Sequence, residues 1–380
     1  MPTFGIIGAG AGVFRHHREA LVQLPGQIVA LADIKAEPAE QRAHELGCAF
    51  YQDYHQMLRE GRPDVAVILT PPFLHAEMAG ACLRAGCHVL VEKPMALHVG
   101  EADSMIAEAH RAERVLRVVF QHRFDSAIRK AKALMDGGCL GQLQHVTLHA
   151  FWPRPARYYQ EVPWRATWRG EGGGVLMNQA PHDLDLLCSL FGMPVRVHGW
   201  THCLLHDIAT EDTAQAMLAW PNGLLGTVFV STAVAGQSRI DIVGTAGSLC
   251  LAGSASQTAT TYAPLTIEMR EFVASTISQP LPILHPVTLT EVAREGKHLD
   301  VYRSLVQAIE QGQGGPLAAG EQARMSLELA NALLLSAQTH ATVALPVDRE
   351  RYAQMLQKLQ KLQRQAEEML ASPARGGDRC

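Results

Sequence analysis

The first 120 residues alternate between short apolar runs and helical patterns, and no other feature restricts the fold as strongly. The predicted strands are residues 4–7, 28–32, 65–69, 88–91 and 115–120, with helical periodicity at 14–24, 36–46, 74–86 and 99–113. The strands are continuously apolar, which is typical of parallel strands covered by helices on both faces. The pattern predicts an α/β, doubly wound parallel sheet that binds its ligand at the carboxyl ends of its strands.

From about residue 140 the predicted strands become longer and are joined by turn signals such as Pro221-Asn222-Gly223. They cover residues 143–150, 195–203, 213–219, 224–231, 238–243 and 247–251, and helices follow at 298–312 and 320–338. This order predicts an α+β domain with a large, mostly antiparallel sheet. The stretch 254–290, rich in Ser, Thr and Pro, receives no assignment. Residues 349–370 form a helix with one apolar stripe, and 372–380 form a tail.

A glycine-rich turn, Gly8 to Val13, follows the first predicted strand and precedes the first helix. Gly8 permits a tight turn, and Gly10 lets the backbone approach a pyrophosphate. Ala11, Gly12 and Val13 lead into the helix, whose N-terminus attracts that anion. The sixth position of the dinucleotide fingerprint is Val13 instead of glycine or alanine, and such a loop on its own can be only a tight turn.

Asp33 ends the second predicted strand. A carboxylate there can accept hydrogen bonds from the ribose hydroxyls of a dinucleotide and repels a 2′-phosphate, which favours NAD and leaves NADP possible. The alternative is a helix-capping role, since a helix follows. Both roles are compatible.

Two further clusters follow predicted strands, at the edge where this fold binds its ligand. Thr70 and Pro71 follow the third strand, with His75 just beyond, and Glu92-Lys93-Pro94 follows the fourth. Out of this context the second cluster would be a solvated turn. At this edge, we expect Thr70, Pro71, His75 and Glu92 to line a cofactor site, with Lys93 over its nicotinamide.

The segments GIIGAGAG, TPPFLH, HVLVEKP and GGGVLMNQAPHDLDLL occur together in this order. The combination resembles the Gfo/Idh/MocA oxidoreductases over about residues 3–345. The resemblance implies an NAD(P)-binding Rossmann domain at 1–121 and a substrate-binding and oligomerisation domain at 122–348. Residues 349–380 add the amphipathic helix and tail. It also implies a homodimer or homotetramer that pairs through the large sheet.

The resemblance implies that Lys93 and His182 are catalytic. Lys93 lies beside the nicotinamide and the substrate hydroxyl, and His182 donates or accepts the proton of the reacting oxygen. Further contacts are implied with the cofactor for Gln121, Trp164 and Arg165, and with the substrate for Asn178, His182, Asp185 and Tyr302.

Many members have an aspartate where this chain has Asn178, and an amide cannot take up a proton. The acid–base role then falls more heavily on His182, with Lys93 as the alternative. Asp185, one turn after His182, either binds substrate or only orients the histidine, and Asp183 is expected to be a solvated neighbour. A histidine on such a helix can also be an ordinary core or surface residue.

Composition excludes several other classes of protein. The net charge is −4, without a basic patch for nucleic acid or anionic lipid, and 47% of the residues are hydrophobic. The eight cysteines include no CxxC pair and the 18 histidines no HExxH motif, so we expect neither disulfides nor a metal. No signal peptide or membrane span is expected, which indicates a cytoplasmic protein.

The predicted function is NAD(P)-dependent hydride transfer to or from a secondary alcohol carbon of a sugar, polyol or sugar derivative. One alternative is an enzyme that retains NAD and uses transient oxidation to cleave a glycosidic bond or eliminate a group. The other is a non-catalytic sugar or nucleotide sensor on the same fold. No motif identifies the sugar, the oxidised carbon or the direction of the reaction.

Overall fold

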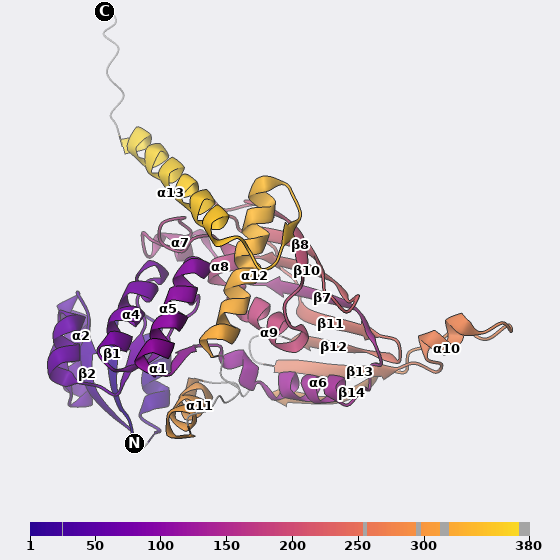
Figure 1. Ribbon diagram of the computed structural model, residues 1–380, viewed down its shortest axis with the longest axis horizontal. Helices are drawn as coiled ribbons and strands as arrows, with labels where there is room; N and C mark the ends of the chain where they lie inside the picture. The colour runs from indigo at the N-terminus through magenta and orange to yellow at the C-terminus, as the bar shows by residue number, and fades with distance from the viewer. Residues whose placement is uncertain (25, 254–256, 294–297, 312–318, 372–380) are drawn as a thin grey trace, which may run out of the picture.

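The computed structural model describes residues 1–371 except 25, 254–256, 294–297 and 312–318. Two sheets organise the chain. Figure 1 shows the N-terminal sheet and its helices on one side, the larger sheet on the other, and helices α9 (Pro181–Phe191) and α12 (Gly320–Thr339) between them. The predicted tail at 372–380 lies outside the described residues.

The N-terminal sheet has six parallel strands in the order β3-β2-β1-β4-β5-β6. Its strands are β1 (Thr3–Ile7), β2 (Gln27–Ala32), β3 (Ala49–Tyr51), β4 (Val65–Ile68), β5 (His88–Val91) and β6 (Leu116–Val118). All four residues of β4 are fully buried, as expected for a strand with helices on both faces. The predicted doubly wound sheet is confirmed, and only β3, three residues long, has no counterpart in the sequence prediction.

The helices of this domain are α1 (Phe14–Leu21), α2 (Ala36–Leu46), α3 (Tyr54–Gln56), α4 (His75–Arg84) and α5 (Val99–Ala112). Each longer helix connects one strand to a parallel neighbour, so all the connections return to the same edge. The loops that leave β1, β4, β5 and β6 therefore meet at the carboxyl ends of the strands.

The second sheet has nine strands in the order β14-β13-β12-β11-β7-β10-β9-β8-β15. All neighbouring pairs are antiparallel except β7 and β10. Its strands are β7 (Leu143–Phe151), β8 (Arg196–His202), β9 (Thr213–Ala219), β10 (Leu225–Ser231), β11 (Ser238–Gly244), β12 (Gly247–Gly253), β13 (Gln257–Pro264), β14 (Val287–Ala293) and β15 (Val343–Ala344). The six predicted strands are present. Strands β13 and β14 come from the stretch that received no assignment.

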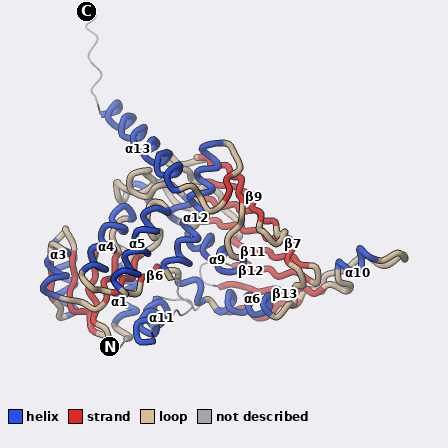
Figure 2. Tube along the Cα trace, in the orientation of Figure 1, coloured by secondary structure: helices blue, strands red, loops and turns tan. Residues whose placement is uncertain are grey.

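One face of this sheet is covered by helices and the other is open, as Figure 2 shows. On the covered face lie α6 (Ser126–Asp136), α9 and α12. On the open face, the alternate residues of the central strands point to solvent, and the side chains of Trp200 and Met217 are 51% and 60% exposed.

Helix α11 (His298–Gln311) returns to the N-terminal domain and packs on α1. Its Val301, Tyr302 and Leu305 are fully buried in one hydrophobic core with Phe4 of β1. The division at residue 121 stays a prediction, but it assigned this helix to the substrate domain, whereas in space the helix belongs to the cofactor domain. The reason is a tertiary contact, which the local pattern of α11 does not contain.

The remaining helices are α7 (Ala156–Gln160), α8 (Val175–Asn178), α10 (Met269–Ala274) and α13 (Arg349–Ala371). The connection that carries α10 extends beyond the edge of the large sheet, and α13 projects from the top of the molecule in this view (Figure 1). None of the helices among the described residues combines the length and the apolar character needed to cross a membrane.

Candidate active site

The glycine-rich turn after β1 is shaped for close backbone approach. Gly8 has a φ of 86°, which favours glycine, and a side chain there would meet the backbone of Leu69 at 2.9 Å. The Gly10 N–H donates to Oδ2 of Asp33 at 2.7 Å, and a side chain on Gly10 would strike that carboxylate. Oδ1 of Asp33 accepts from the Lys35 N–H at 2.8 Å. The predicted loop and Asp33 therefore lie together at the start of α1.

His75 connects two of the loops at the strand ends. Its ring nitrogens lie 2.8 Å from the carbonyl oxygens of Thr70 and Pro94, and the side chain is fully buried. Thr70 and Pro71 line the same edge as predicted, at the end of β4. The prediction that His75 contacts the cofactor requires correction, because a fully buried ring cannot reach a ligand. It fixes the Lys93-Pro94 turn instead.

Lys93 is half-buried and points toward the end of α8. Its Nζ donates to the backbone carbonyl of Asn178 at 2.6 Å, which joins the end of β5 to the substrate domain. Burial lowers the pKa of Lys93 below its ordinary value, and the negative charges of Glu92 and Glu171 oppose that shift. An amine in this position can donate a hydrogen bond to a substrate oxygen.

Asn178 is 9% exposed and each polar atom of its side chain is engaged. Tyr158 Oη and Gln179 Nε2 donate to its Oδ1 at 2.8 and 2.6 Å, and its Nδ2 donates to Oε1 of Glu171. The predicted substrate contact at Asn178 is thus the centre of a hydrogen-bond network. Its neighbours in that network were not predicted from the sequence.

Glu171 is the site residue that sequence reasoning missed. It is 2% exposed, its Oε2 accepts from the Ala166 N–H at 2.6 Å, and burial raises its pKa to about 7. One signal was available, because Glu171 is the only charged residue within the run Gly170 to Gly174.

His182 lies on α9 above the end of β6. Its ring centre is 4.8 Å from that of His122 and 5.9 Å from that of Phe120, both edge-on. It therefore stands on the side of the strand ends opposite to the glycine-rich turn, beyond Lys93 in strand order. This is the edge at which the fold binds a ligand.

Asp185 and Asp183 differ from their predicted surroundings. Arg123 donates from Nε and Nη2 to the two oxygens of Asp185 at 2.7 and 2.6 Å, and the aspartate is 1% exposed. The predicted substrate contact at Asp185 is corrected, because both its oxygens face the guanidinium. Asp183 is also not simply solvated, since Oδ2 accepts from Trp152 Nε1 at 2.8 Å.

Arg165 and Trp164 lie in the loop that leads to Glu171. The Arg165 guanidinium stacks 3.9 Å above the ring of Tyr158 and 5.5 Å from that of Trp164. Gln121, just after β6, has a buried side-chain oxygen that finds no hydrogen-bond partner within the described residues. Such an atom suits a ligand that donates a hydrogen bond.

Tyr302 also requires correction, because it is fully buried and cannot contact substrate. Its hydroxyl lies 2.7 Å from Nδ1 of His17, whose Nε2 is 3.0 Å from Oε1 of Glu92. Burial opposes ionisation of Glu92, but the His17 hydrogen bond and the nearby positive charges lower its pKa to about 2. A ring nitrogen of His17, a carboxylate oxygen of Glu92 and a ring nitrogen of His298 lie within 4.8 Å of one another, a spacing that could also hold a metal ion. We interpret them as a buried hydrogen-bond network that supports the Glu92-Lys93 turn.

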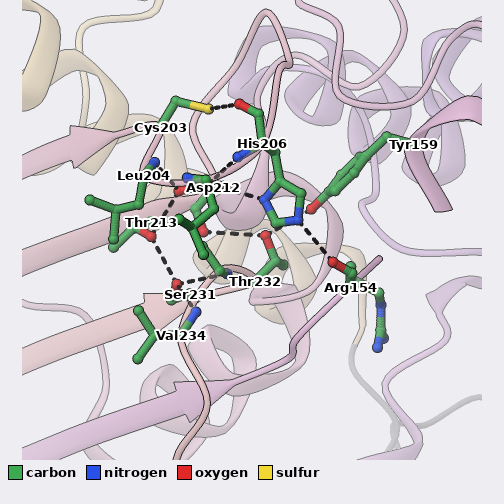
Figure 3. A network of polar contacts seen from close by, with 12 residues as sticks. Arg154, Tyr159, Cys203, Leu204, His206, Asp212, Thr213, Ser231, Thr232 and Val234 are labelled. Atoms are coloured by element: carbon green, nitrogen blue, oxygen red, sulfur yellow. Dashed lines mark hydrogen bonds and ion pairs between the residues drawn. The ribbon is translucent and has the colours of Figure 1, made fainter. Parts of the chain in front are cut away.

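A second network fixes the backbone beside the site (Figure 3). His206 lies between Oδ2 of Asp212, 3.0 Å from its Nδ1, and the carbonyl oxygen of Arg154, 2.8 Å from its Nε2. Nearby, Tyr159 donates to Thr232 Oγ1 at 2.7 Å. Arg154 in turn donates from Nη2 to Gln179 at 2.8 Å, so the network holds a guanidinium against the Asn178 cluster.

A cavity of about 830 Å³ adjoins these groups. Arg154 and Asp183 belong to its wall, together with Trp152, His149 and Arg239. The volume is in the range of small-molecule sites.

Two parts of the chain match known sequence families. Residues 3–120 match the oxidoreductase family with an NAD-binding Rossmann fold, and residues 128–250 match the GFO/IDH/MocA C-terminal domain. The chain belongs to this family. Family membership confirms the resemblance stated above and makes the protein an NAD-dependent oxidoreductase.

Individual relatives of this family member agree. Myo-inositol 2-dehydrogenase of Thermotoga maritima is 27% identical over 64% of this chain and 73% of that protein. An uncharacterized oxidoreductase of Synechocystis sp. is 30% identical over 66% and 71%. The WlbA dehydrogenase from Bordetella pertussis, in complex with NADH and UDP-GlcNAcA, superposes with a TM-score of 0.76. It is 28% identical, and the match covers 91% of this chain and 99% of that one.

The residues at the strand ends fit such a cofactor. A side chain on Gly12 would meet nothing within 4 Å, so the turn presents bare backbone there. The buried oxygen of Gln121 offers an acceptor at the far end of the same edge. An extended dinucleotide can therefore lie along this edge, with its pyrophosphate at the glycine-rich turn and a donor group near the Gln121 oxygen.

Proposed function

We propose that this family member transfers a hydride between NAD and a secondary alcohol carbon of a sugar, polyol or sugar derivative. The observation that carries the proposal is the placement of Lys93 and His182. They come from different domains, yet both lie at the carboxyl edge of the strands that holds the glycine-rich turn. A substrate hydroxyl between them would meet a cationic donor and an imidazole.

The cofactor would lie along that edge. Residues from Gly8 to Val13 would hold the pyrophosphate and Asp33 the ribose, with Thr70, Pro71, Glu92 and Gln121 lining the path toward the nicotinamide. Trp164 and Arg165 would close over it from the substrate domain. When bound, NAD supplies the hydride acceptor or donor.

The protein then has to manage one proton and one developing charge. In oxidation the substrate hydroxyl loses its proton as its carbon loses hydride, and His182 accepts that proton. Lys93 donates to the oxygen as it becomes alkoxide-like and stabilises the charge. In reduction the same groups act in reverse. Asn178 orients the substrate through the network that already fixes its amide.

The substrate class is supported by the polar character of the site and by the relatives. The names of two relatives mention myo-inositol and a nucleotide sugar, both of which present secondary hydroxyls on a ring. The cavity next to Arg154 would accommodate a substituent carried by such a ring. We therefore expect a cyclic polyol or a sugar derivative in preference to a small open-chain alcohol.

We also propose a homodimer or homotetramer that pairs through the open face of the large sheet. Trp200, Met217 and Leu225 are each more than half exposed on this face. Large apolar side chains grouped on an exposed face are common at protein–protein interfaces.

A spectrophotometric screen tests the function. The protein is incubated with NAD and a panel of cyclitols, sugars, glycosides and nucleotide sugars, absorbance is followed at the NADH band, and products are analysed by mass spectrometry. NADH formation together with a keto product is the expected result.

Two other outcomes would contradict the proposal. A cleaved or dehydrated product without net NADH would indicate an enzyme that retains its cofactor. Binding of NAD and a sugar without any product across the panel would favour a sensor.

A further inference from the structure

Glu171 lies in the centre of the site, yet the reaction described above does not use it. Its side chain is 2% exposed, and its two oxygens are held by the Ala166 N–H and by Nδ2 of Asn178. Burial of a carboxyl is costly unless its surroundings compensate for it. Glu171 acts electrostatically on Lys93, which suggests why the protein stabilises a buried carboxyl at this position.

Asn178 connects this carboxyl to Lys93. Lys93 Nζ donates to the backbone carbonyl of Asn178 at 2.6 Å, and the side-chain amide of the same residue donates to Glu171. Oδ1 of this amide accepts from both Tyr158 and Gln179. Its NH₂ group is therefore directed at Glu171. Asn178 thus contacts both the Lys93 amine, through its backbone carbonyl, and the Glu171 carboxyl, through its side chain.

Several charged groups surround this pair. Glu92, from the same turn, and Glu171 favour the ammonium form of Lys93, whereas Arg154 and Arg165 oppose it. Glu171 and Glu211 act on each other as like charges.

Two of these carboxyls differ in how they respond to pH. The pKa of Glu92 is about 2, so its charge is constant near neutral pH, whereas the pKa of Glu171 is about 7. Glu171 is therefore the acidic neighbour of Lys93 whose charge changes in the working range.

We propose that Glu171 is a positioning residue for Lys93, and that its carboxylate, held by Asn178, keeps the lysine in the ammonium form that acts on the substrate oxygen. This inference rests on the proposed function of Lys93. No covalent step is involved, and Glu171 itself does not touch the substrate. It determines at which pH Lys93 carries its charge.

Competitive labelling of the protein without cofactor tests the inference. Lys93 is reductively methylated over a range of pH, and the extent of reaction is read from its peptide by mass spectrometry. In Glu171→Gln the half-point of labelling should move to lower pH by about one unit or more, because one opposite charge is lost. In the double variant with Asn178→Asp it should return toward the wild-type value, because a carboxylate again faces the amine.

Two further variants keep the test decisive. Glu328→Gln removes another buried carboxyl, one that pairs with Arg349 far from the site, and it should leave the Lys93 half-point unchanged. Asn178→Leu keeps the carboxyl but removes its link, so the half-point should move in the same direction as in Glu171→Gln, by less. The inference would be overturned if the Lys93 half-point stayed at the wild-type value in Glu171→Gln and Asn178→Leu. If only one of these variants folds, that variant decides.

The labelling result does not depend on turnover. If the Lys93 half-point moves but no alcohol is oxidised, the proposed function is wrong and the coupling of Glu171 to Lys93 stands. If alcohols are oxidised and the half-point is insensitive to Glu171, the inference alone is wrong. Where both hold, the pH dependence of kcat/KM should shift in Glu171→Gln in the same direction as the labelling curve.

Discussion

His182 owes its position to an ion pair one turn further along its own helix. Arg123, from the turn after β6, binds both oxygens of Asp185 and so fixes α9 above the strand end. The aspartate is buried and its charge is matched by the guanidinium, which is the condition under which a buried ion pair is tolerated. The position of His182 therefore depends on a buried ion pair that takes no part in the proposed reaction.

The first prediction concerns proton transfer. His182→Ala should lower kcat by about 10²–10⁴-fold, the typical contribution of a general acid or base, and leave the Kd of NAD nearly unchanged. Lys93→Ala should lower kcat as well, and the double variant should lose less than the product of the two losses, because both groups act on one oxygen. Steady-state kinetics and cofactor titration measure these effects. Near-normal turnover in His182→Ala would exclude the imidazole as the proton acceptor.

The second prediction concerns pH and stability. Glu211 is 5% exposed, its Oε1 accepts from the N–H groups of Gly174 and Leu176, and burial raises its pKa to about 7 from an ordinary 4.5. Because the folded state binds the proton more tightly, the wild type should lose stability as pH rises from about 4.5 to 7.

Glu211→Gln keeps the accepting oxygen and removes the charge. Its Tm relative to the wild type should therefore rise between pH 5 and pH 8, by the equivalent of about 1–3 kcal/mol. Thermal unfolding at the two pH values provides the measurement. A difference that stays constant or falls would show that Glu211 is ionised in the folded protein at pH 5.

Among the elements, α13 is built in two parts. Tyr352 and Leu356 near its start are 1% and 3% exposed and belong to the main core, whereas Leu362 and Met369 are exposed. Between these parts, Gln360 and Gln363 bond the backbone of Trp168 at 3.1 and 2.8 Å. Through these two hydrogen bonds, α13 holds the loop that runs from Trp164 to Glu171.

The third prediction separates these two roles. A chain that ends at Leu359 should keep most of its Tm but show faster hydrogen exchange at residues 164–171 and a higher KM. A chain that ends at Val347 also loses two large buried side chains, each worth about 2–5 kcal/mol, and should be strongly destabilised. The double substitution Gln360→Ala and Gln363→Ala should reproduce the first effect. Unchanged exchange in that variant would argue against the brace.

The whole molecule consists of two sheets with helices packed between them. Helix α12 contacts α5 and β6 of the cofactor domain as well as β8 and α9 of the substrate domain. Most of the buried apolar side chains of both domains form one continuous core. The candidate active site lies where the helices between the two sheets meet the strand ends, so its two halves are held by packing that neither domain provides alone.

The fourth prediction belongs to this scale. Because Trp200, Met217 and Leu225 expose apolar side chains on the open sheet face, light scattering should find a dimer or tetramer at micromolar protein. Met217→Glu, in the middle of the face, should yield monomers, because a desolvated charge opposes pairing. Val22→Glu, an equally exposed apolar position on the cofactor domain, is the control and should leave the assembly unchanged. A monomeric wild type would remove the basis for the interface.

Much of the fold was predictable from local signals. Continuous apolar runs and glycine at the β1 turn are properties of short segments. They predicted the parallel sheet correctly, and the structure places the loop and Asp33 side by side at its edge. The motif segments likewise led to Lys93, Asn178 and His182, which the structure gathers at one edge. Strands β3, β13, β14 and β15 were missed, because short or polar strands are stabilised by neighbours that the local sequence does not show.

The sequence by itself determined most of the elements, the family to which the chain belongs and the position of the loops that carry the candidate site residues. Only the tertiary structure decided what those side chains touch. His75, Asp185 and Tyr302 carry suitable chemistry, but burial and their partners turn them into supports. Glu171 has no motif of its own, yet packing places its carboxyl against Asn178 and near Lys93. Burial and charge pairing depend on residues distant in the chain, and for that reason function at this site is a tertiary property.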